Sequence, residues 1–200
     1  MEKEPFYQRN AKTNESENRW KRFWWSLVQQ YLFRPSPKYL QGWRRFLLRC
    51  FGAKIGWKSS ISPTTIIYRP WDLVMGNHSS IEENCQITCP VIIGDYVAIA
   101  QKCDLIAGGH DVKSRGQEVT FAPIVIGDSA FIGIGCYIAA GVKIGTASVI
   151  AAHMNIYKSI PANKIVVPEP VRTIKVDRIP PEDFDNYYYN FTEQCKNSKY

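Results

Sequence analysis

The 200-residue sequence predicts an all-β fold, a solenoid of the parallel β-helix type, and three observations support it. The first is a run of isoleucines spaced six residues apart, at Ile126, Ile132, Ile138, Ile144, Ile150 and Ile156. The second is that glycine or alanine follows five of these six isoleucines. A helix requires apolar spacings of three and four, and an open strand requires alternation, so a spacing of six fits neither. It fits hexapeptide repeats in which three repeats form one coil and residues about eighteen apart stack.

The third observation is that the same rhythm occurs earlier, from Ile55 to Leu105, with an interruption before Ile126. The interruption contains Gly108-Gly109-His110-Asp111 and continues as a polar stretch to Pro123. We therefore predict a β-helix domain over residues 53–165 with an inserted loop near 107–123. A smaller interruption surrounds Trp71 and Asp72, which either line a surface groove or, in the case of Trp71, plug the end of a coil.

Residues 19–52 predict a basic, aromatic arm of two helices, after a polar segment, residues 1–18, that we expect to be disordered. Asn18 is a suitable cap for a helix beginning at Arg19. Apolar residues then recur at helical spacing: Trp20, Trp24, Leu27, Tyr31 and Leu32, widened by Phe23, Trp25 and Val28. Prolines 35 and 37 end this helix.

The second helix is predicted from Lys38 to about Phe51 and is closed by Gly52. Its apolar face is expected to consist of Leu40, Trp43, Phe46, Leu47 and Cys50. Three arginines, Arg44, Arg45 and Arg49, are expected to lie off that face.

The charge is unevenly distributed and the arm is strongly basic: the net charge of the chain is +7, and no acidic residue occurs between Glu17 and Asp72. Two interpretations remain open and are compatible with each other. The helices either cap the open end of the solenoid, or residues 19–51 make a peripheral contact with a membrane surface. Nucleic-acid binding is disfavoured because no recognition motif accompanies the charge.

Composition sets further bounds on the protein. The length suits one domain. No apolar run approaches the length of a membrane span, and no secretory signal is present. The default expectation is therefore a cytoplasmic protein, with contact at the inner face of the membrane as the alternative. The six cysteines are scattered and are expected to be reduced. The C-terminal extension, residues 166–200, has no assigned role.

Among three histidines, only His110 lies in a glycine-bracketed loop outside the repeat. Neutral imidazole is the natural general base near neutral pH, so His110 is the predicted catalytic residue, and Asp111 follows it directly. No nucleophile elbow, phosphate loop or dinucleotide fingerprint is present. A site with only a base suits direct attack of an activated hydroxyl or amine on a carried acyl group.

Several stretches carry a family resemblance. These are the repeat, the Gly-Gly-His110-Asp loop, Phe33-Arg-Pro-Ser-Pro, Pro70-Trp-Asp-Leu and Ala122-Pro-Ile-Val-Ile-Gly127. Over about residues 20–175 the chain resembles the left-handed β-helix acyltransferases of the hexapeptide-repeat family, and most closely the WcaF-type colanic acid biosynthesis acetyltransferases. The resemblance implies a left-handed coil, a homotrimer with sites between neighbouring chains, acetyl-CoA as co-substrate, and no metal.

The resemblance also implies which residues form the site, with His110 as the base. Cofactor-binding positions are Phe131, Gly133, Ala152, Tyr157, Lys158 and Arg172. Acceptor-binding positions are Gln86, Gln101, Asp111 and Trp71. The chain departs from the usual family residues at Phe131, His153, Tyr157 and the stretch Pro168-Glu-Pro-Val-Arg172, all on the expected CoA side.

The function expected from these features is acetyl-CoA-dependent O-acetylation of a sugar hydroxyl, in an exopolysaccharide or a lipid-linked glycan precursor. Two other classes compete. One is a non-catalytic trimeric scaffold or binding module that has lost CoA use. The other is a metal hydratase that ligates zinc through histidines across a trimer interface.

Overall fold

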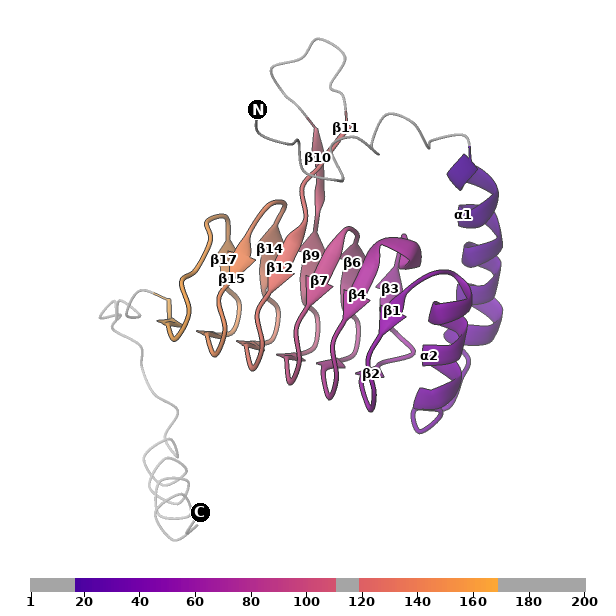
Figure 1. Ribbon diagram of the computed structural model, residues 1–200, viewed down its shortest axis with the longest axis horizontal. Helices are drawn as coiled ribbons and strands as arrows, with labels where there is room; N and C mark the ends of the chain where they lie inside the picture. Colours follow the sequence, from indigo (N-terminus) through magenta and orange to yellow (C-terminus); the bar gives the residue numbers. More distant parts are fainter. Residues whose placement is uncertain (1–16, 111–118, 169–200) are drawn as a thin grey trace, which may run out of the picture. The chain divides into compact units, whose positions relative to one another are not determined.

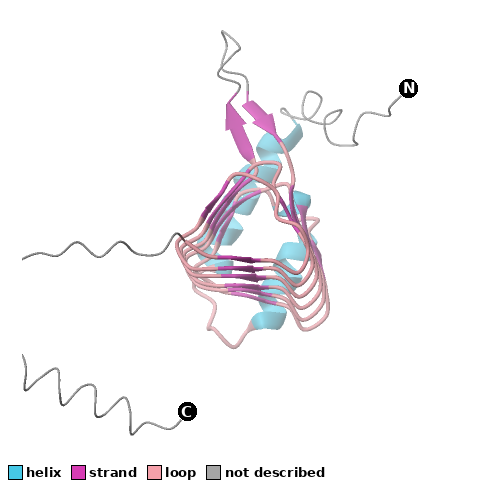
Figure 2. Cartoon of the chain, turned by 90° about the vertical axis from the view of Figure 1, so that its left-hand side faces the viewer, coloured by secondary structure: helices cyan, strands magenta, loops and turns pink. Residues whose placement is uncertain are grey.

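The computed structural model describes residues 17–110 and 119–168, which form a helical arm and a three-sided parallel solenoid (Figures 1 and 2). The arm contains α1 (Glu17–Val28), the π-helical turn η1 (Gln29–Phe33) and α2 (Gln41–Cys50). A 3₁₀ turn, η2 (Pro70–Asp72), lies between the first coil and the second. The fold class is the parallel β-helix that the six-residue repeat predicts.

Short strands build three parallel sheets, one for each side of the solenoid. Sheet A contains β1 (Lys54–Ile55), β4 (Leu73–Met75), β7 (Val91–Ile93), β12 (Ile124–Ile126) and β15 (Lys143–Ile144). Sheet B contains β2 (Ser60–Ile61), β5 (Ser80–Ile81), β8 (Ala98–Ile99), β13 (Phe131–Ile132), β16 (Val149–Ile150) and β18 (Ile165–Val166). Sheet C contains β3 (Ile66–Ile67), β6 (Gln86–Thr88), β9 (Asp104–Ile106), β14 (Tyr137–Ala139) and β17 (Asn155–Ile156).

The six-residue ladder sets the register of these sheets. Ile126 pairs with Ile144, and Ile132 pairs with Ile150, so residues eighteen apart stack as the repeat predicts. The repeat isoleucines from β1 to β17 point inward and are at most 6% exposed. The core is therefore a continuous column of branched side chains, and each coil buries its apolar side chains only by stacking on the neighbouring coils.

Each corner of the solenoid has one position that requires a small residue and another that requires a left-handed backbone. The small residue after each isoleucine avoids the next coil: a Cβ added at Gly133 would lie 2.6 Å from the backbone nitrogen of Ala152. The left-handed backbone conformation occurs two residues later, at positions such as His78, Asn84 and His153, where φ is between 54° and 58°. Close approach and positive φ are thus separate demands on separate corner residues.

The cysteine prediction is confirmed for Cys85, Cys89, Cys103 and Cys136, which are free and buried, whereas Cys50 is free but exposed. Thiols at repeat positions bond carbonyl oxygens of the following coil, as in the 3.0 Å contact from Cys136 Sγ to Ala151 O. Burial raises the pKa of the Cys89 thiol. Cys195 lies outside the described residues.

The arm has the predicted two helices, but their bounds and buried faces differ from expectation. α1 begins at Glu17, so Asn18 lies within the helix and is not its cap. α2 runs from Gln41 to Cys50, and Gly52 follows it with φ of +95°, as a closing glycine should. Most of the expected apolar stripe faces outward. Trp25 and Leu47 of that stripe pack inward as expected, together with Phe33, Arg44 and Leu48, which were not predicted to do so.

The inward face of the arm caps the first coil by pairing with its free backbone groups. In sheet A, Arg49 Nη2 donates to Ile55 O at 2.6 Å. In sheet B, Arg44 Nε donates to Ile61 O at 2.7 Å. In sheet C, Trp25 Nε1 donates to Ile67 O at 2.6 Å. The capping interpretation is therefore supported on all three sides of the solenoid.

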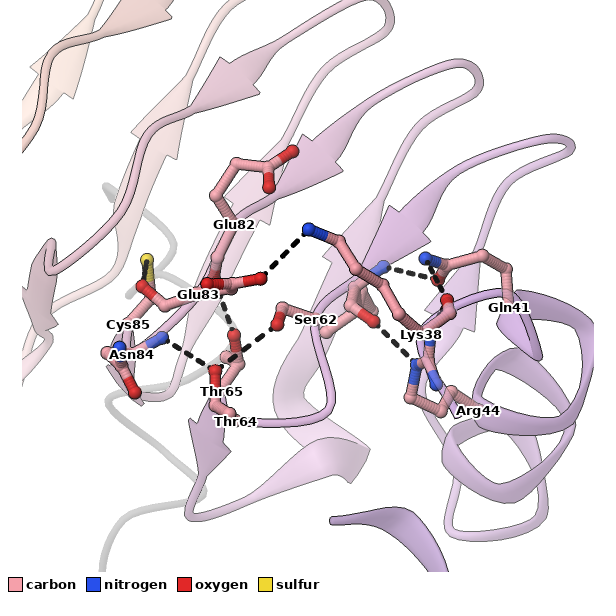
Figure 3. Close-up of polar contacts among 11 residues, drawn as sticks. Lys38, Gln41, Arg44, Ser62, Thr64, Thr65, Glu82, Glu83, Asn84 and Cys85 are labelled. Carbon is pink, nitrogen blue, oxygen red and sulfur yellow. Dashed lines mark hydrogen bonds and ion pairs between the residues drawn. The ribbon is translucent and has the colours of Figure 1, made fainter. Parts of the chain in front are cut away.

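Arg44 is the centre of this cap and corrects the expectation that the α2 arginines lie off the packed face. Its side chain is fully buried, and its guanidinium also bonds Ser36 Oγ and the carbonyl oxygens of Pro37 and Lys38, at 2.6 to 2.8 Å. Figure 3 shows Arg44 and Gln41 reaching from the arm to the first coil, with Lys38 extending to Glu83. A planar guanidinium with five donors suits a cluster of backbone acceptors, which explains a buried cation without a carboxylate.

Candidate active site

The predicted histidine loop is a β-hairpin that projects from one corner of the solenoid, between sheet C and sheet A (Figure 2). It consists of β10 (Gly108–His110) and β11 (Val119–Phe121), in which His110 pairs with Val119. Ile93 pairs with Ile126 across 33 positions, whereas Ile126 pairs with Ile144 across 18. The hairpin is thus an insertion that leaves the stacking of the coils in register.

His110 occupies the end of β10, where the hairpin leaves the described residues. Asp111, predicted to contact the acceptor, lies outside them, as does Arg172, predicted to lie near the nucleotide phosphates. The base of the hairpin is well packed. Gly108 faces Phe121, since a Cβ added at Gly108 would lie 3.0 Å from the Phe121 ring.

A polar cluster that sequence reasoning largely missed lies beside the base of the hairpin. The Arg69 guanidinium lies 4.9 Å from the centroid of the Phe121 ring, a cation–π contact, and its Nη2 forms an ion pair with Asp72 Oδ2 at 2.7 Å. Arg69 Nε and Trp71 Nε1 are buried without a hydrogen-bond partner among the described residues. Burial raises the pKa of the Asp72 carboxyl despite the attraction of Arg69.

The sequence indicates this cluster through a change in the spacing of the inward-facing residues. Ile67 and Met75 are both inward-facing, yet they are eight residues apart where the repeat gives six. The two additional residues form part of η2. This turn places Trp71 and Asp72 at the corner between sheets C and A, which is also the corner of the hairpin. Trp71, a predicted acceptor residue, is half-buried there and contacts Gly52 of the arm.

The other predicted acceptor residues lie further around the solenoid. Gln86 is on the outward side of sheet C, where its Nε2 donates to Tyr68 Oη at 2.7 Å. Gln101 is exposed at the corner between sheet B and sheet C. The structure therefore places Trp71 beside the hairpin, Gln86 on the neighbouring sheet and Gln101 beyond it.

The predicted cofactor residues fall into two groups and one outlier. Gly133 and Ala152 are in contact in successive coils at the corner between sheets B and C. Tyr157 and Lys158 follow sheet C at the hairpin corner and line a largely apolar pocket of about 310 Å³ at the last coil. Phe131 stands on the outward side of sheet B and is 46% exposed.

The two remaining histidines occupy different corners. His78 follows sheet A and stacks its ring on Tyr96, with centroids 5.0 Å apart. His153 follows sheet B and lies over Gly135, where an added Cβ would be 2.5 Å from its Nδ1. Both hold left-handed corner positions, in which histidine is enriched, so local backbone geometry accounts for them.

Comparison with known proteins gives consistent matches. The bacterial transferase hexapeptide (six repeats) family matches residues 123–153. The chain is 36% identical over 154 residues to WcaF of Escherichia coli (strain K12), an acetyltransferase named for colanic acid biosynthesis, covering 76% of this chain and 84% of that protein. It is 31% identical over 152 residues to the galactoside O-acetyltransferase of the same organism, covering 73% and 72%.

A solved structure of galactoside acetyltransferase in complex with coenzyme A has the same fold. Its TM-score to this chain is 0.70 at 29% sequence identity, and the match covers 88% of this chain and 89% of that one. The match extends beyond the solenoid, because residues 54–166 span a smaller share of the chain than the 88% that is covered.

Proposed function

The chain belongs to the hexapeptide-repeat acetyltransferases, and from this we propose that it transfers an acetyl group from acetyl-CoA to a sugar hydroxyl. The acceptor that we propose is an exopolysaccharide or a lipid-linked glycan precursor. The single observation that carries the proposal is the histidine hairpin, an insertion at one corner of an otherwise regular solenoid in a chain of this family. WcaF is named for polysaccharide biosynthesis, which supports this class of acceptor.

His110 is proposed as the general base. It would take the proton of the acceptor hydroxyl while the hydroxyl oxygen attacks the thioester carbonyl of acetyl-CoA. The carbon–sulfur bond then breaks, the acetyl group remains on the sugar oxygen, and CoA leaves as the thiol after receiving a proton. Direct transfer is supported by the absence of a nucleophile motif in the sequence.

The polar cluster at the base of the hairpin is proposed as part of the acceptor site, together with Trp71, Gln86, Gln101 and Asp111. Trp71 offers an indole with an unpaired N–H, and Arg69 offers an unpaired Nε. Buried donors without partners are costly, and a sugar hydroxyl or ring oxygen is a suitable acceptor for them. The contact between Arg69 and Phe121 links this cluster to the hairpin that carries His110.

The cofactor side is proposed to consist of Phe131, Gly133, Ala152, Tyr157, Lys158 and Arg172. The apolar pocket beside Tyr157 and Lys158 suits the alkyl parts of a pantetheine arm, and exposed Lys158 supplies a cation for phosphate. The narrow corner at Gly133 and Ala152 leaves little side-chain bulk between a ligand and the backbone.

A homotrimer is part of the proposal because one chain separates His110 from part of the proposed cofactor side. The hairpin lies at one edge of sheet C together with Tyr157 and Lys158, whereas Gly133 and Ala152 lie at the other edge. A neighbouring chain that presents its second edge to the hairpin of the first would bring His110 and the cofactor side together. Closed cyclic symmetry would then form equivalent sites between each pair of chains.

The test compares His110→Ala with wild type by thiol release from acetyl-CoA over a panel of sugar acceptors. Loss of a general base should lower turnover by a factor on the order of ten to ten thousand. His78→Asn is the matched control, because Asn tolerates the left-handed conformation at that corner and His78 lies far along the chain from the hairpin. Turnover of the His110 variant close to that of wild type would remove it from the mechanism.

Calorimetric titration with acetyl-CoA separates this function from the scaffold alternative. The proposal expects the His110→Ala variant to bind acetyl-CoA as wild type does, because the base does not hold the cofactor. The departures from family residues at Phe131, His153 and Pro168 favour the scaffold as the second candidate. A folded wild-type protein that fails to bind acetyl-CoA would support that candidate instead.

A further inference from the structure

The outward side of the arm exposes an unusual number of large apolar side chains. Trp20, Tyr31 and Tyr39 are 71%, 69% and 82% exposed. We call the full set the aromatic face; it consists of Trp20, Phe23, Trp24, Tyr31, Leu32, Tyr39, Leu40, Trp43 and Phe46. Exposed apolar patches of this kind mark interaction sites on soluble proteins.

The aromatic face is continuous within each helix and linked between them. On α1, the Phe23 ring lies 6.3 Å from Trp20 and 5.6 Å from Trp24. On α2, Trp43 stacks on Phe46 with centroids 5.8 Å apart. Trp43 Nε1 also donates to Leu32 O at 3.2 Å, which joins α2 to the turn that ends the first helix.

The cap on the first coil does not use this face. Capping is performed by the opposite side of the arm, through Trp25, Arg44 and Arg49 and through the buried apolar residues beside them. The aromatic face therefore remains exposed when the other side of the arm seals the solenoid.

Charge beside the aromatic face is one-sided. Four exposed cations belong to the first helix and its end: Arg19, Lys21, Arg22 and Arg34. Within the described residues none of the four forms a salt bridge, whereas Lys38 is paired with Glu83 and the α2 arginines are bonded to the coil. No carboxylate occurs from residue 18 to residue 71, so the partner should be anionic and extended.

A lipid surface fits both properties. Tryptophan and tyrosine favour the boundary between headgroups and acyl chains, and exposed lysine and arginine bind anionic headgroups. Across residues 17–110 and 119–168, no helix combines the length and hydropathy that crossing a bilayer requires. We propose that the arm, residues 17–50, docks this protein on the surface of an anionic lipid bilayer, with the aromatic face in the headgroup boundary.

The inferred docking needs only the arm and is independent of acetyl transfer. Its test uses the full chain with vesicles of phosphatidylcholine alone and of phosphatidylcholine mixed with phosphatidylglycerol. Co-sedimentation is expected with the anionic vesicles, and to a smaller extent with the neutral ones. Raising the salt concentration should weaken the difference between them, because salt screens exposed charges.

The variant that tests the aromatic face combines Trp20→Ser, Phe23→Ser and Trp24→Ser. Its partition onto anionic vesicles should fall by a factor on the order of ten or more, since three apolar contacts with the bilayer are lost. Tyr96→Ser is the matched control: Tyr96 is 62% exposed at a corner of the solenoid, and Ser129 already occupies the equivalent left-handed position. This control should bind as wild type does.

Two results would overturn the proposal. One is equal binding of the triple variant and wild type. The other is failure of wild type to bind anionic vesicles. If the triple variant then also differs from wild type in sedimentation coefficient, the aromatic face would be assigned to contact with a second copy of this chain. Thermal unfolding of the triple variant checks its fold. If it does not fold, Tyr31→Ser combined with Tyr39→Ser tests the same expectation on two side chains that are largely exposed.

Discussion

Asp72, in the cluster that we propose as part of the acceptor site, is a residue whose burial should lower stability. Its carboxylate is paired with Arg69, yet burial raises its pKa, so the folded protein disfavours the charged form. A raised pKa in the folded state means that stability is greatest below the ordinary aspartate pKa of about 3.9 and decreases as the pH rises through the folded value. Such an arrangement is typical of groups held in place for function.

Replacing Asp72 with Asn should remove this contribution. The free energy of unfolding of wild type should fall relative to that of Asp72→Asn as the pH is raised from about 3.9 upward, because only wild type must ionise a buried carboxyl. Urea unfolding at a series of pH values measures the difference. Asp104→Asn, on the outward side of sheet C, is the matched control. Parallel curves for wild type and Asp72→Asn would contradict the expectation.

Corner residues mark a limit of sequence interpretation at this scale. His110 could be singled out because it lies outside the repeat, whereas His78 and His153 occur within it. The structure gives these two a conformational reason, positive φ, that a six-residue pattern of apolar side chains does not encode. Arg69 was not predicted for the site because its importance depends on Phe121, which lies 52 positions later in the sequence.

Among the elements, the arm is the one whose role the structure changes most. Two helices were predicted from apolar periodicity, and two are present, but only Leu47 of the predicted apolar face of α2 is buried. Periodicity assigns arginine to the outside, and it cannot detect that the edge of the first coil offers free carbonyl oxygens. The coils themselves were predictable because every repeat meets the same neighbours, so one rule covers most of the chain.

Arg44→Leu should therefore destabilise the protein, although leucine is the more apolar residue. Removal of the guanidinium leaves the buried carbonyl oxygen of Ile61 without its donor and takes one of two donors from Pro37 O and from Lys38 O. The free energy of unfolding should therefore fall by about 3 kcal/mol. Arg34→Leu, at an exposed position of the same arm, should change it by less than about 0.5 kcal/mol. Urea unfolding monitored by tryptophan fluorescence measures both. Equal loss in the two variants would argue against a capping role for Arg44.

For the whole molecule, the main feature is the distance around the solenoid between the hairpin corner and the corner of Gly133 and Ala152. Sequence could assign residues to both groups, through the family resemblance, but it could not show that sheet C lies between them. That arrangement arises because three repeats complete each coil, so positions six or twelve apart lie on different sides of the solenoid and positions eighteen apart lie on the same side. A site shared by two chains follows naturally from this geometry, and it is the basis of the proposed trimer.

Complementation between chains tests this shared site. His110→Ala and Ala152→Phe, which obstructs the proposed cofactor side, should each be inactive alone. When the two variants are co-expressed in equal amounts, each mixed trimer should contain one site with both intact halves, which restores about one quarter of wild-type activity. The readout is thiol release from acetyl-CoA by the purified mixed protein. Failure to restore activity in mixed trimers would place both halves of the site in the same chain.

The cap on the first coil also determines the direction in which the solenoid can be built during translation. The arm precedes the coils in the sequence, so it is available before any of them is complete. Since the arm occupies one edge of the first coil, each later coil can be added only to the opposite edge, and the chain supplies the coils in that order. Arg44 is remote in sequence from the hairpin, but it fixes the first coil by bonding Ile61 O. The later coils, including the one from which the hairpin with His110 projects, are then added to that first coil.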